Sequence, residues 1–204
     1  MRIEHLPTTD IEARLHAAVS ALDHTRSTNL PHVTSIIYEV GTRIGKIRPN
    51  EGDIMDGEWR LSGDLGFLWE KIIEGYLSDP ELMVIRIGEL EEDGIAFTPD
   101  GLAIGQGVSG LEVHEYKVIW ASADKDIRED WKRMAQVKAY LYALSKKFDT
   151  PILSVLFTIL YPCGNYRPPA PKIDPVRVWF EWHELVENWQ MIRNNRELVK
   201  IKEE

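Results

Sequence analysis

The chain has 204 residues, of which 44% are hydrophobic, and its formal net charge is −9. This length suits one domain with a full core, and there is no run of about 18 apolar residues that would predict a membrane span. The acidic balance argues against a protein that coats nucleic acid nonspecifically, because such binding depends on neutralising phosphates. The single cysteine, Cys163, excludes an intrachain disulfide and a four-cysteine metal site.

The first residues, MRIEHLPTTDIEARL, lack the basic-then-apolar pattern of a secretory signal. Together with the single cysteine, this pattern predicts a reduced protein of the cytoplasm. We expect no association with a membrane.

The N-terminal third is expected to be helical. Residues 10–22 predict a helix with Asp10 as its N-cap. The segment HVTSIIYEVGTRIG, residues 32–45, predicts a second short helical or irregular element. Residues 62–77 predict an amphipathic helix, because apolar side chains recur there at helical spacing: Leu65, Leu68, Trp69, Ile72, Ile73 and Tyr76.

The sequence then changes to a β pattern. We expect an antiparallel meander whose turns contain Gly and Asp. Its strands would be LMVIRIGEL (82–90), IAFTP (95–99), LAIGQG (102–107) and LEVHEYKVIW (111–120).

A long helix is predicted at residues 126–148, where apolar side chains recur every three or four positions. The remaining elements would be a buried strand (152–161), a Pro-rich loop (164–175), a strand (176–182) and a final helix (183–200). This order predicts an α/β (α+β) fold with a mixed central sheet flanked by helices.

The stretch GLEVHEYKVIW carries two charges where a strand should be apolar. Side chains alternate between faces along a strand, so Glu115 and Lys117 share the face of Leu111, Val113 and Ile119. A solvent-facing charge pair would be expected on the other face, with Glu112 and His114. The pair is therefore either a buried structural ion pair or part of a functional site.

For several other polar residues, a structural and a functional interpretation both remain open. Asp100 lies in the turn Pro99-Asp100-Gly101, and Glu70 lies off the apolar stripe of its helix. Gln136 and Tyr140 are one helical turn apart and share a face, which can be a polar helix flank. Basic residues form three clusters, each of which can be a solvated surface. They are Arg43, Lys46 and Arg48, then Lys132, Arg133 and Lys138, then Lys146 and Lys147.

In their order and spacing, these motifs resemble the PD-(D/E)XK nuclease superfamily, specifically its RecB-like and lambda-exonuclease-like members. The matching residues are Gly66 and Glu70 (GxxxE), Pro99-Asp100, Glu115-Tyr116-Lys117 (ExK), and Gln136 to Tyr140 (QxxxY). The resemblance covers about residues 60–160 and implies a restriction-endonuclease-like αβββαβ core. We expect one nuclease domain over 1–204, with a helical region at 1–60 and a strand and helix at 161–204.

The chain departs from parts of the family pattern. Many RecB-like members have a histidine in the first motif helix, where this chain has Trp69 and Glu70, which looks more like the lambda-exonuclease type. Some relatives bind an iron–sulfur cluster through four cysteines, and Cys163 alone excludes that cluster here.

Phosphodiester hydrolysis explains why such residues would gather. Mg²⁺ or Mn²⁺, as one ion or two, prefers oxygen ligands, which Glu70, Asp100 and Glu115 could supply, and the resemblance adds the Tyr116 main-chain carbonyl. Lys117 would orient the attacking water and offset developing charge. The resemblance further implies that Gln136 positions Lys117 or a water and that Tyr140 contacts the nucleic acid. Lys132 and Arg133 would add phosphate contacts.

These features predict a metal-dependent deoxyribonuclease acting on single-stranded DNA or duplex ends. The resemblance favours an exonuclease or end-processing enzyme of recombination or repair, of the kind that bacteria and their phages use, and leaves a homo-oligomer open. One alternative is a catalytically inactive nucleic-acid-binding or assembly module. Another is an interaction scaffold, based on the tryptophans of the C-terminal region, which are more simply core and packing residues: Trp179, Trp182 and Trp189.

Overall fold

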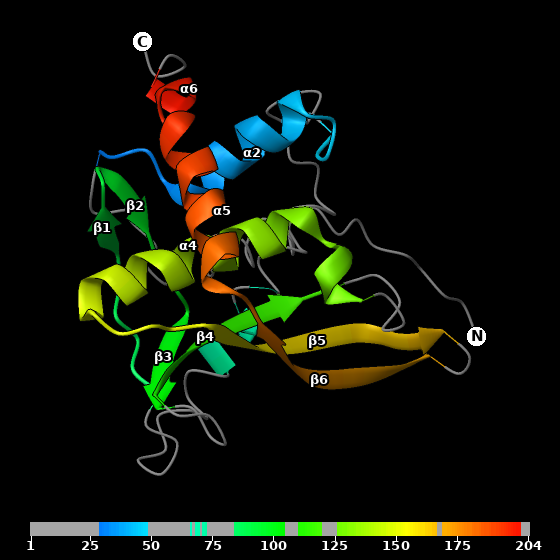
Figure 1. The fold of residues 1–204 in the computed structure, drawn as a ribbon. Helices are drawn as coiled ribbons and strands as arrows, with labels where there is room; N and C mark the ends of the chain where they lie inside the picture. Colours follow the sequence, from blue (N-terminus) through cyan, green and yellow to red (C-terminus); the bar gives the residue numbers. More distant parts are fainter. Residues whose placement is uncertain are drawn as a thin grey trace, which may run out of the picture.

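A four-stranded mixed sheet forms the centre of the protein in the computed structural model (Figure 1). Its strands lie in the order β3 (Gly101–Ile104), β4 (Leu111–Val118), β5 (Ser154–Tyr166) and β6 (Pro169–Trp179). The β4–β5 pair is parallel, and the two outer pairs are antiparallel. The predicted fold class is confirmed. The structure describes residues 29–48, 66, 68, 69, 71, 72, 84–104, 110–119, 126–166 and 169–200.

Most of the described helices lie on one face of this sheet. Because parallel neighbours need a crossover, β4 is joined to β5 through a 3-10 turn, η1 (Ile127–Glu129), and the long helix α4 (Trp131–Phe148). Figure 1 shows α4 running across the sheet, with α2 (Val33–Arg43) and α5 (Trp182–Asn194) on its outer side. In the described part of the chain, no helix combines the length and apolar character that a membrane crossing requires.

The predicted helix at 126–148 is divided at Asp130, which caps α4. The Asp130 carboxylate accepts a hydrogen bond from the Arg133 N–H at 3.0 Å, as an N-cap residue does. The helix buries the middle of its predicted apolar stripe, whereas Phe148 at its end is 43% exposed. The helix ends at Asp149, whose φ is 48°. Four buried side chains form the centre of the stripe: Met134, Val137, Leu141 and Leu144.

The predicted meander is divided: its first and second halves each pair antiparallel, but they lie in different sheets. β1 (Leu90–Glu92) and β2 (Ile95–Phe97) form a separate two-stranded sheet, joined by a tight turn in which Asp93 and Gly94 both have positive φ. Of the predicted strand at 82–90, Leu90 belongs to β1, but residues 84–89 form no strand and make one isolated bridge from Ile85 to Leu102. Gly88, with φ of 77°, interrupts extended backbone there.

The predicted Pro-rich loop at 164–175 is also wrong, because β5 continues to Tyr166 and β6 begins at Pro169. Proline is tolerated in β6 because this strand lies at the edge of the sheet, where its missing N–H interrupts no inner ladder. The final predicted strand and helix shift accordingly. Trp182 begins α5, and the helix breaks after Asn194 before α6 (Glu197–Lys200).

Two predicted helices in the N-terminal half are only partly described. The predicted helix at 10–22 lies outside the described residues. Within the predicted helix at 62–77, the five described residues are all helical: Gly66, Leu68, Trp69, Lys71 and Ile72. Residues 33–43 form a regular helix, where the sequence left helical and irregular structure open.

The two faces of β4 meet different parts of the protein. Val113 belongs to the main core with the strand residues Val155 and Phe157 of β5 and the inner side of α4. Tyr116, on the opposite face, packs with Trp69 in a second, smaller cluster. The prediction that odd-numbered residues of β4 face the core is therefore confirmed, and it places Glu115 and Lys117 under α4.

Candidate active site

Asp100 stands where the pairing of β3 with β4 stops. The last backbone pair joins Gly101 to His114, so Asp100 is the next residue opposite Glu115. At this point the side chain of Asp100 continues the hydrogen bonding, because its Oδ2 accepts the Tyr116 N–H at 2.7 Å. A charged acceptor on a backbone donor makes a strong, directional bond, which fixes the carboxylate beside β4.

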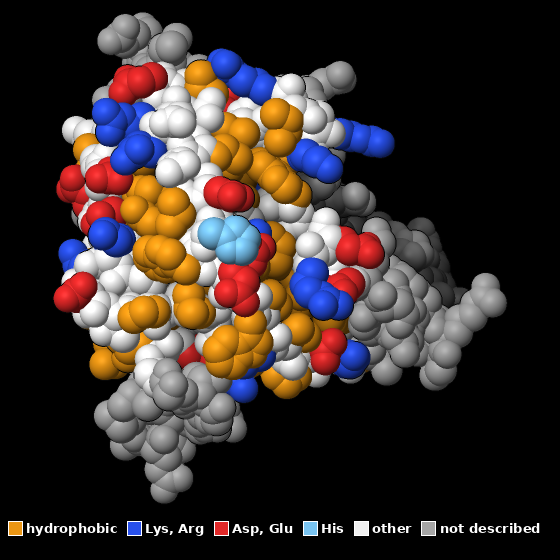
Figure 2. Space-filling model, viewed as in Figure 1, with side chains coloured by type: hydrophobic (Ala, Val, Ile, Leu, Met, Phe, Trp, Pro, Cys, Tyr) orange, Lys and Arg blue, Asp and Glu red, His pale blue; other side chains and the backbone are white. Residues whose placement is uncertain are grey.

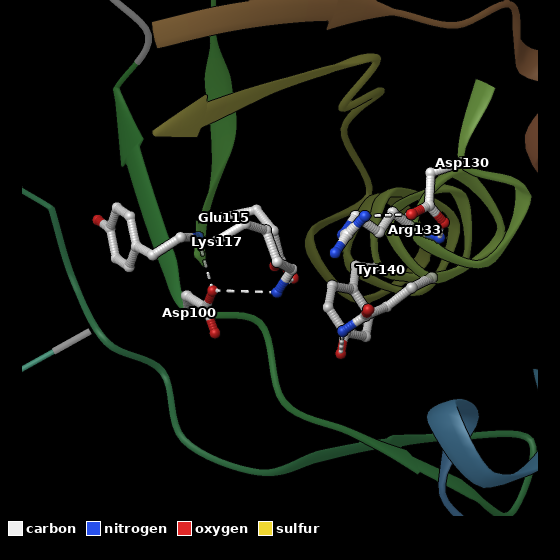
Figure 3. Close-up of polar contacts among 8 residues, drawn as sticks. Asp100, Glu115, Lys117, Asp130, Arg133 and Tyr140 are labelled. Atoms are coloured by element: carbon white, nitrogen blue, oxygen red, sulfur yellow. Dashed lines mark hydrogen bonds and ion pairs between the residues drawn. The ribbon is translucent and has the colours of Figure 1, made fainter. Parts of the chain in front are cut away.

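Glu115 and Lys117 meet this carboxylate from β4. The Glu115 side chain is fully buried, with 0% exposure. The Lys117 ammonium forms an ion pair with Glu115 Oε1 and lies 3.9 Å from Asp100 Oδ2. Figure 3 shows the three side chains turned toward one another on the side of β4 that faces α4. Two carboxylates, one from β4 and one from the residue before β3, therefore converge on one positive charge.

Gln136 and Tyr140 lie on α4, across from this group. Gln136 Nε2 donates a hydrogen bond to the Tyr140 hydroxyl at 2.7 Å, so the predicted shared face is formed. The Tyr140 ring is 1% exposed and packs against the Phe97 ring with their centroids 6.0 Å apart. A ring this deeply buried is more consistent with a residue that positions other side chains than with one that contacts a nucleic-acid strand.

The two predicted phosphate-binding residues differ in their surroundings. Arg133 forms an ion pair with the N-cap residue Asp130, so its guanidinium is already engaged (Figure 3). Lys132 is an exposed residue whose ammonium lies 6.0 Å from the centre of the Tyr38 ring on α2. Partial burial of this ammonium lowers the pKa of Lys132, and the positive charges of Arg133 and Lys117 lower it further. The charge of Lys132 therefore interacts with the charge of Lys117 in the site.

A second charged group lies on the other face of β4, which the sequence assigned to solvent. Glu112 is 0% exposed there, and it accepts hydrogen bonds from Arg177 Nε at 2.6 Å and Ser154 Oγ at 3.1 Å. Burial lowers the pKa of the neighbouring His114, with the Arg177 charge acting in the same direction and the Glu112 charge against it. The sequence signal for this pairing was weak, because Arg177 lies 65 residues from Glu112.

The described residues supply part of a metal site. No cluster of three or more His, Cys, Asp or Glu side chains occurs within the described ranges, and Glu70, the third predicted carboxylate, lies outside them. Asp100 and Glu115 nevertheless fit a hard metal cation, because their oxygens already face one positive charge, the Lys117 ammonium. The Tyr116 carbonyl, which directly follows Glu115 in sequence, is the remaining predicted ligand.

The three tryptophans on which the scaffold alternative is based differ in burial. Trp189 is 1% exposed and donates a hydrogen bond to Asp93 Oδ2 at 2.8 Å, as a core residue would. Trp179 and Trp182 are 59% and 41% exposed, so neither is a core residue, although Trp182 is a packing residue. Trp182 stacks on Tyr142, with ring centroids 5.5 Å apart.

Comparisons with known proteins find only distant likeness. No protein-family model and no curated protein sequence matches the chain. Among solved structures, SSO0001 is 14% identical, with a TM-score of 0.48 over 95% of this chain and 89% of that one. A protein of Eubacterium rectale named "Putative exonuclease" is 12% identical, with a TM-score of 0.35 over 96% of this chain and 66% of that one. These similarities are too low to assign a family.

Proposed function

We propose that the protein is a Mg²⁺- or Mn²⁺-dependent DNA nuclease, an exonuclease or end-processing enzyme of recombination or repair. The observation that carries this proposal is the convergence of Asp100 and Glu115 on the Lys117 ammonium beneath α4. A buried carboxylate beside a second one is costly without a cation, because two such charges about 4 Å apart repel by roughly 4 kcal/mol at an effective dielectric near 20. A site that binds a dication explains why both are present.

Each residue has a distinct role in phosphodiester hydrolysis. Asp100, Glu115 and the Tyr116 carbonyl would hold the cation, and Glu70 is proposed to join them. The bound metal would supply Lewis-acid stabilisation of phosphate charge and a more acidic water. Lys117, once a dication replaces it between the carboxylates, would turn its ammonium to the attacking water or the scissile phosphate and offset negative charge there.

Gln136 and Tyr140 on α4 would keep Lys117 in place rather than take part in bond breaking. The hydrogen bond between Gln136 and Tyr140 fixes both side chains at one turn of a well-capped helix. A group held by its neighbours within a few tenths of an ångström of its working position is what such catalysis requires. We therefore assign Gln136 and Tyr140 as positioning residues.

The test is release of nucleotides from end-labelled linear DNA with Mg²⁺ or Mn²⁺. Lys117→Ala should abolish most of the activity, because loss of one charge-stabilising group costs on the order of a hundredfold to a thousandfold in rate. Lys138→Ala is the matched control, since Lys138 has 22% exposure against 20% for Lys117 but pairs with Glu184 on α5. Equal rates for wild type and Lys117→Ala would refute the site assignment.

An inactive nucleic-acid-binding module is the alternative outcome of the same experiment. It would bind the labelled DNA without releasing nucleotides at any metal concentration. Asp100→Asn separates the two functions, because it removes the carboxylate charge while keeping an oxygen that can accept the Tyr116 N–H. In a nuclease this change abolishes turnover, whereas in a binding module it leaves DNA affinity unchanged.

A further inference from the structure

The end of α2 and the turn that follows it present three basic side chains. The N–H groups of Lys46 and Ile47 both donate to the Gly41 carbonyl, at 2.8 and 3.0 Å, and Gly45 adopts a φ of 70°. This arrangement closes the helix end in the way a left-handed glycine allows. The turn thereby holds three exposed side chains in place: Arg43, Lys46 and Arg48.

The same turn packs on the first turn of α4. A Cβ atom added to Gly41 would lie only 2.7 Å from Trp131 Cζ3, so the backbone of α2 comes close to that ring. The next residue, Lys132, reaches back to Tyr38 of α2. The basic turn and Lys132 therefore lie at the start of α4, the helix that faces the Lys117 side of β4 (Figure 3). We call Arg43, Lys46, Arg48 and Lys132 the basic strip.

The basic strip has the opposite sign to the chain as a whole, whose net charge is −9. Within the described part of the chain, none of its four members forms an ion pair, whereas other basic residues such as Lys138, Lys172 and Arg177 do. Figure 2 shows Lys and Arg side chains standing out around the end of α2, with acidic side chains gathered elsewhere on this face. A local positive surface on an acidic protein attracts a polyanion to that place.

We propose that the basic strip binds the phosphate backbone of the DNA strand next to the scissile bond and guides that strand to Lys117. This inference rests on the proposed nuclease function and extends it to residues outside the carboxylate site. Contacts from lysine and arginine to phosphates carry no information about base sequence. The strip would therefore act equally on all sequences, which suits an enzyme that digests from an end.

The test compares two variants that lose the same charge at opposite ends of the helical layer. Lys46→Gln/Arg48→Gln removes two cations from the strip. Lys146→Gln/Lys147→Gln removes two exposed cations from the last turn of α4, about 20 Å along the helix from Lys132 at 1.5 Å per residue. Affinity for a fluorescent duplex oligonucleotide is measured by anisotropy in EDTA, at 50 and 200 mM salt.

Each phosphate contact contributes about 0.9 to the slope of log affinity against log salt. The strip variant should lose about 1.8 from this slope, so that its affinity deficit at 50 mM salt is about 12-fold larger than at 200 mM. The control variant should keep the wild-type slope. Identical slopes and affinities for both variants, while wild type binds or digests DNA, would overturn this inference and leave the nuclease proposal intact.

Two further outcomes are decisive. If the wild-type protein neither binds nor digests DNA, the nuclease proposal fails together with the strip. If the strip variant loses binding to vesicles containing phosphatidylserine but DNA affinity is unaffected, the strip is a lipid-binding surface and the inference is wrong.

Discussion

Replacing Lys117 by methionine tests the central arrangement without any assumption about the reaction. Methionine keeps most of the packing of the lysine stem but removes the ammonium. In wild type this ammonium lies 3.9 Å from Asp100 Oδ2 and pairs with the fully buried Glu115. Measured without divalent metal, the variant should therefore be less stable than wild type.

The size of the loss follows from burial. At 3.9 Å the attraction to Asp100 alone is about 4 kcal/mol at an effective dielectric of 20, and removing one member of a buried pair costs roughly 3–5 kcal/mol. Because Lys117 and Asp100 are 20% and 15% exposed, we expect the lower end, about 3 kcal/mol. For a chain of this length, that corresponds to a decrease in Tm of about 6–12 °C.

The assay is thermal or urea unfolding in EDTA, with Lys138→Met as the control. The two lysines are similarly exposed, but Glu184, the partner of Lys138, is 35% exposed, whereas Glu115 is 0% exposed. An exposed pair contributes only about 0–1 kcal/mol, so the control should melt close to wild type. Equal losses for the two variants would show that Glu115 is not buried against Lys117.

Metal addition then separates a structural ion pair from a metal site. A ligand that binds only the folded state stabilises it, by about 2.7 kcal/mol at a concentration one hundred times its Kd. Mn²⁺ must displace the ammonium in wild type but has no competitor in Lys117→Met. The rise in Tm with Mn²⁺ should therefore be larger for the variant, and a smaller or absent rise would mean that cation and ammonium do not share a site.

Three more predictions concern single residues around the site. Asp100→Ala should abolish the Mn²⁺-induced rise in Tm, because it removes a ligand and the acceptor of the Tyr116 N–H; an unchanged rise contradicts the ligand assignment. Gly101→Ala should destabilise the protein by about 1–3 kcal/mol in urea unfolding, since its Cβ would lie 2.7 Å from Val84 Cγ1; wild-type stability would contradict that contact. Burial lowers the pKa of His114, so unfolding takes up a proton below the usual histidine pKa near 6.5 and stability falls as the pH drops below that value. His114→Gln should flatten this decline, whereas His183→Gln, at an exposed position, should not.

The elements that the sequence predicted well are those fixed by a periodic pattern on a single segment. The apolar stripe of α4 and the alternation along β4 each depend on neighbours in sequence, so the buried sides of Val137 and Val113 followed directly. The predicted strand at 82–90 failed for a different reason. Gly88 turns the backbone, and within residues 84–89 only Ile85 has a pairing partner.

The loop prediction at 164–175 failed because proline was weighed without knowing where the strand would lie. Proline is excluded from a central strand but not from an edge strand, and β6 has only β5 as a neighbour. The edge position is decided by the parallel docking of β5 on β4, which brings together residues far apart in sequence. The burial of Glu112 was missed for the same reason, since its partner Arg177 comes from β6.

The composition of the candidate site could be predicted, but its geometry depends on one register. Antiparallel pairing of Gly101 with His114 sets Asp100 opposite Glu115, and a shift by one residue would turn Glu115 and Lys117 to the face of Tyr116 and Trp69. The Asp100 hydrogen bond to the Tyr116 N–H opposes such a shift, because that bond forms only in the observed register. Asp100 therefore stabilises the strand pairing that brings its own carboxylate to Lys117, and substitutions at this position should affect stability and metal binding together.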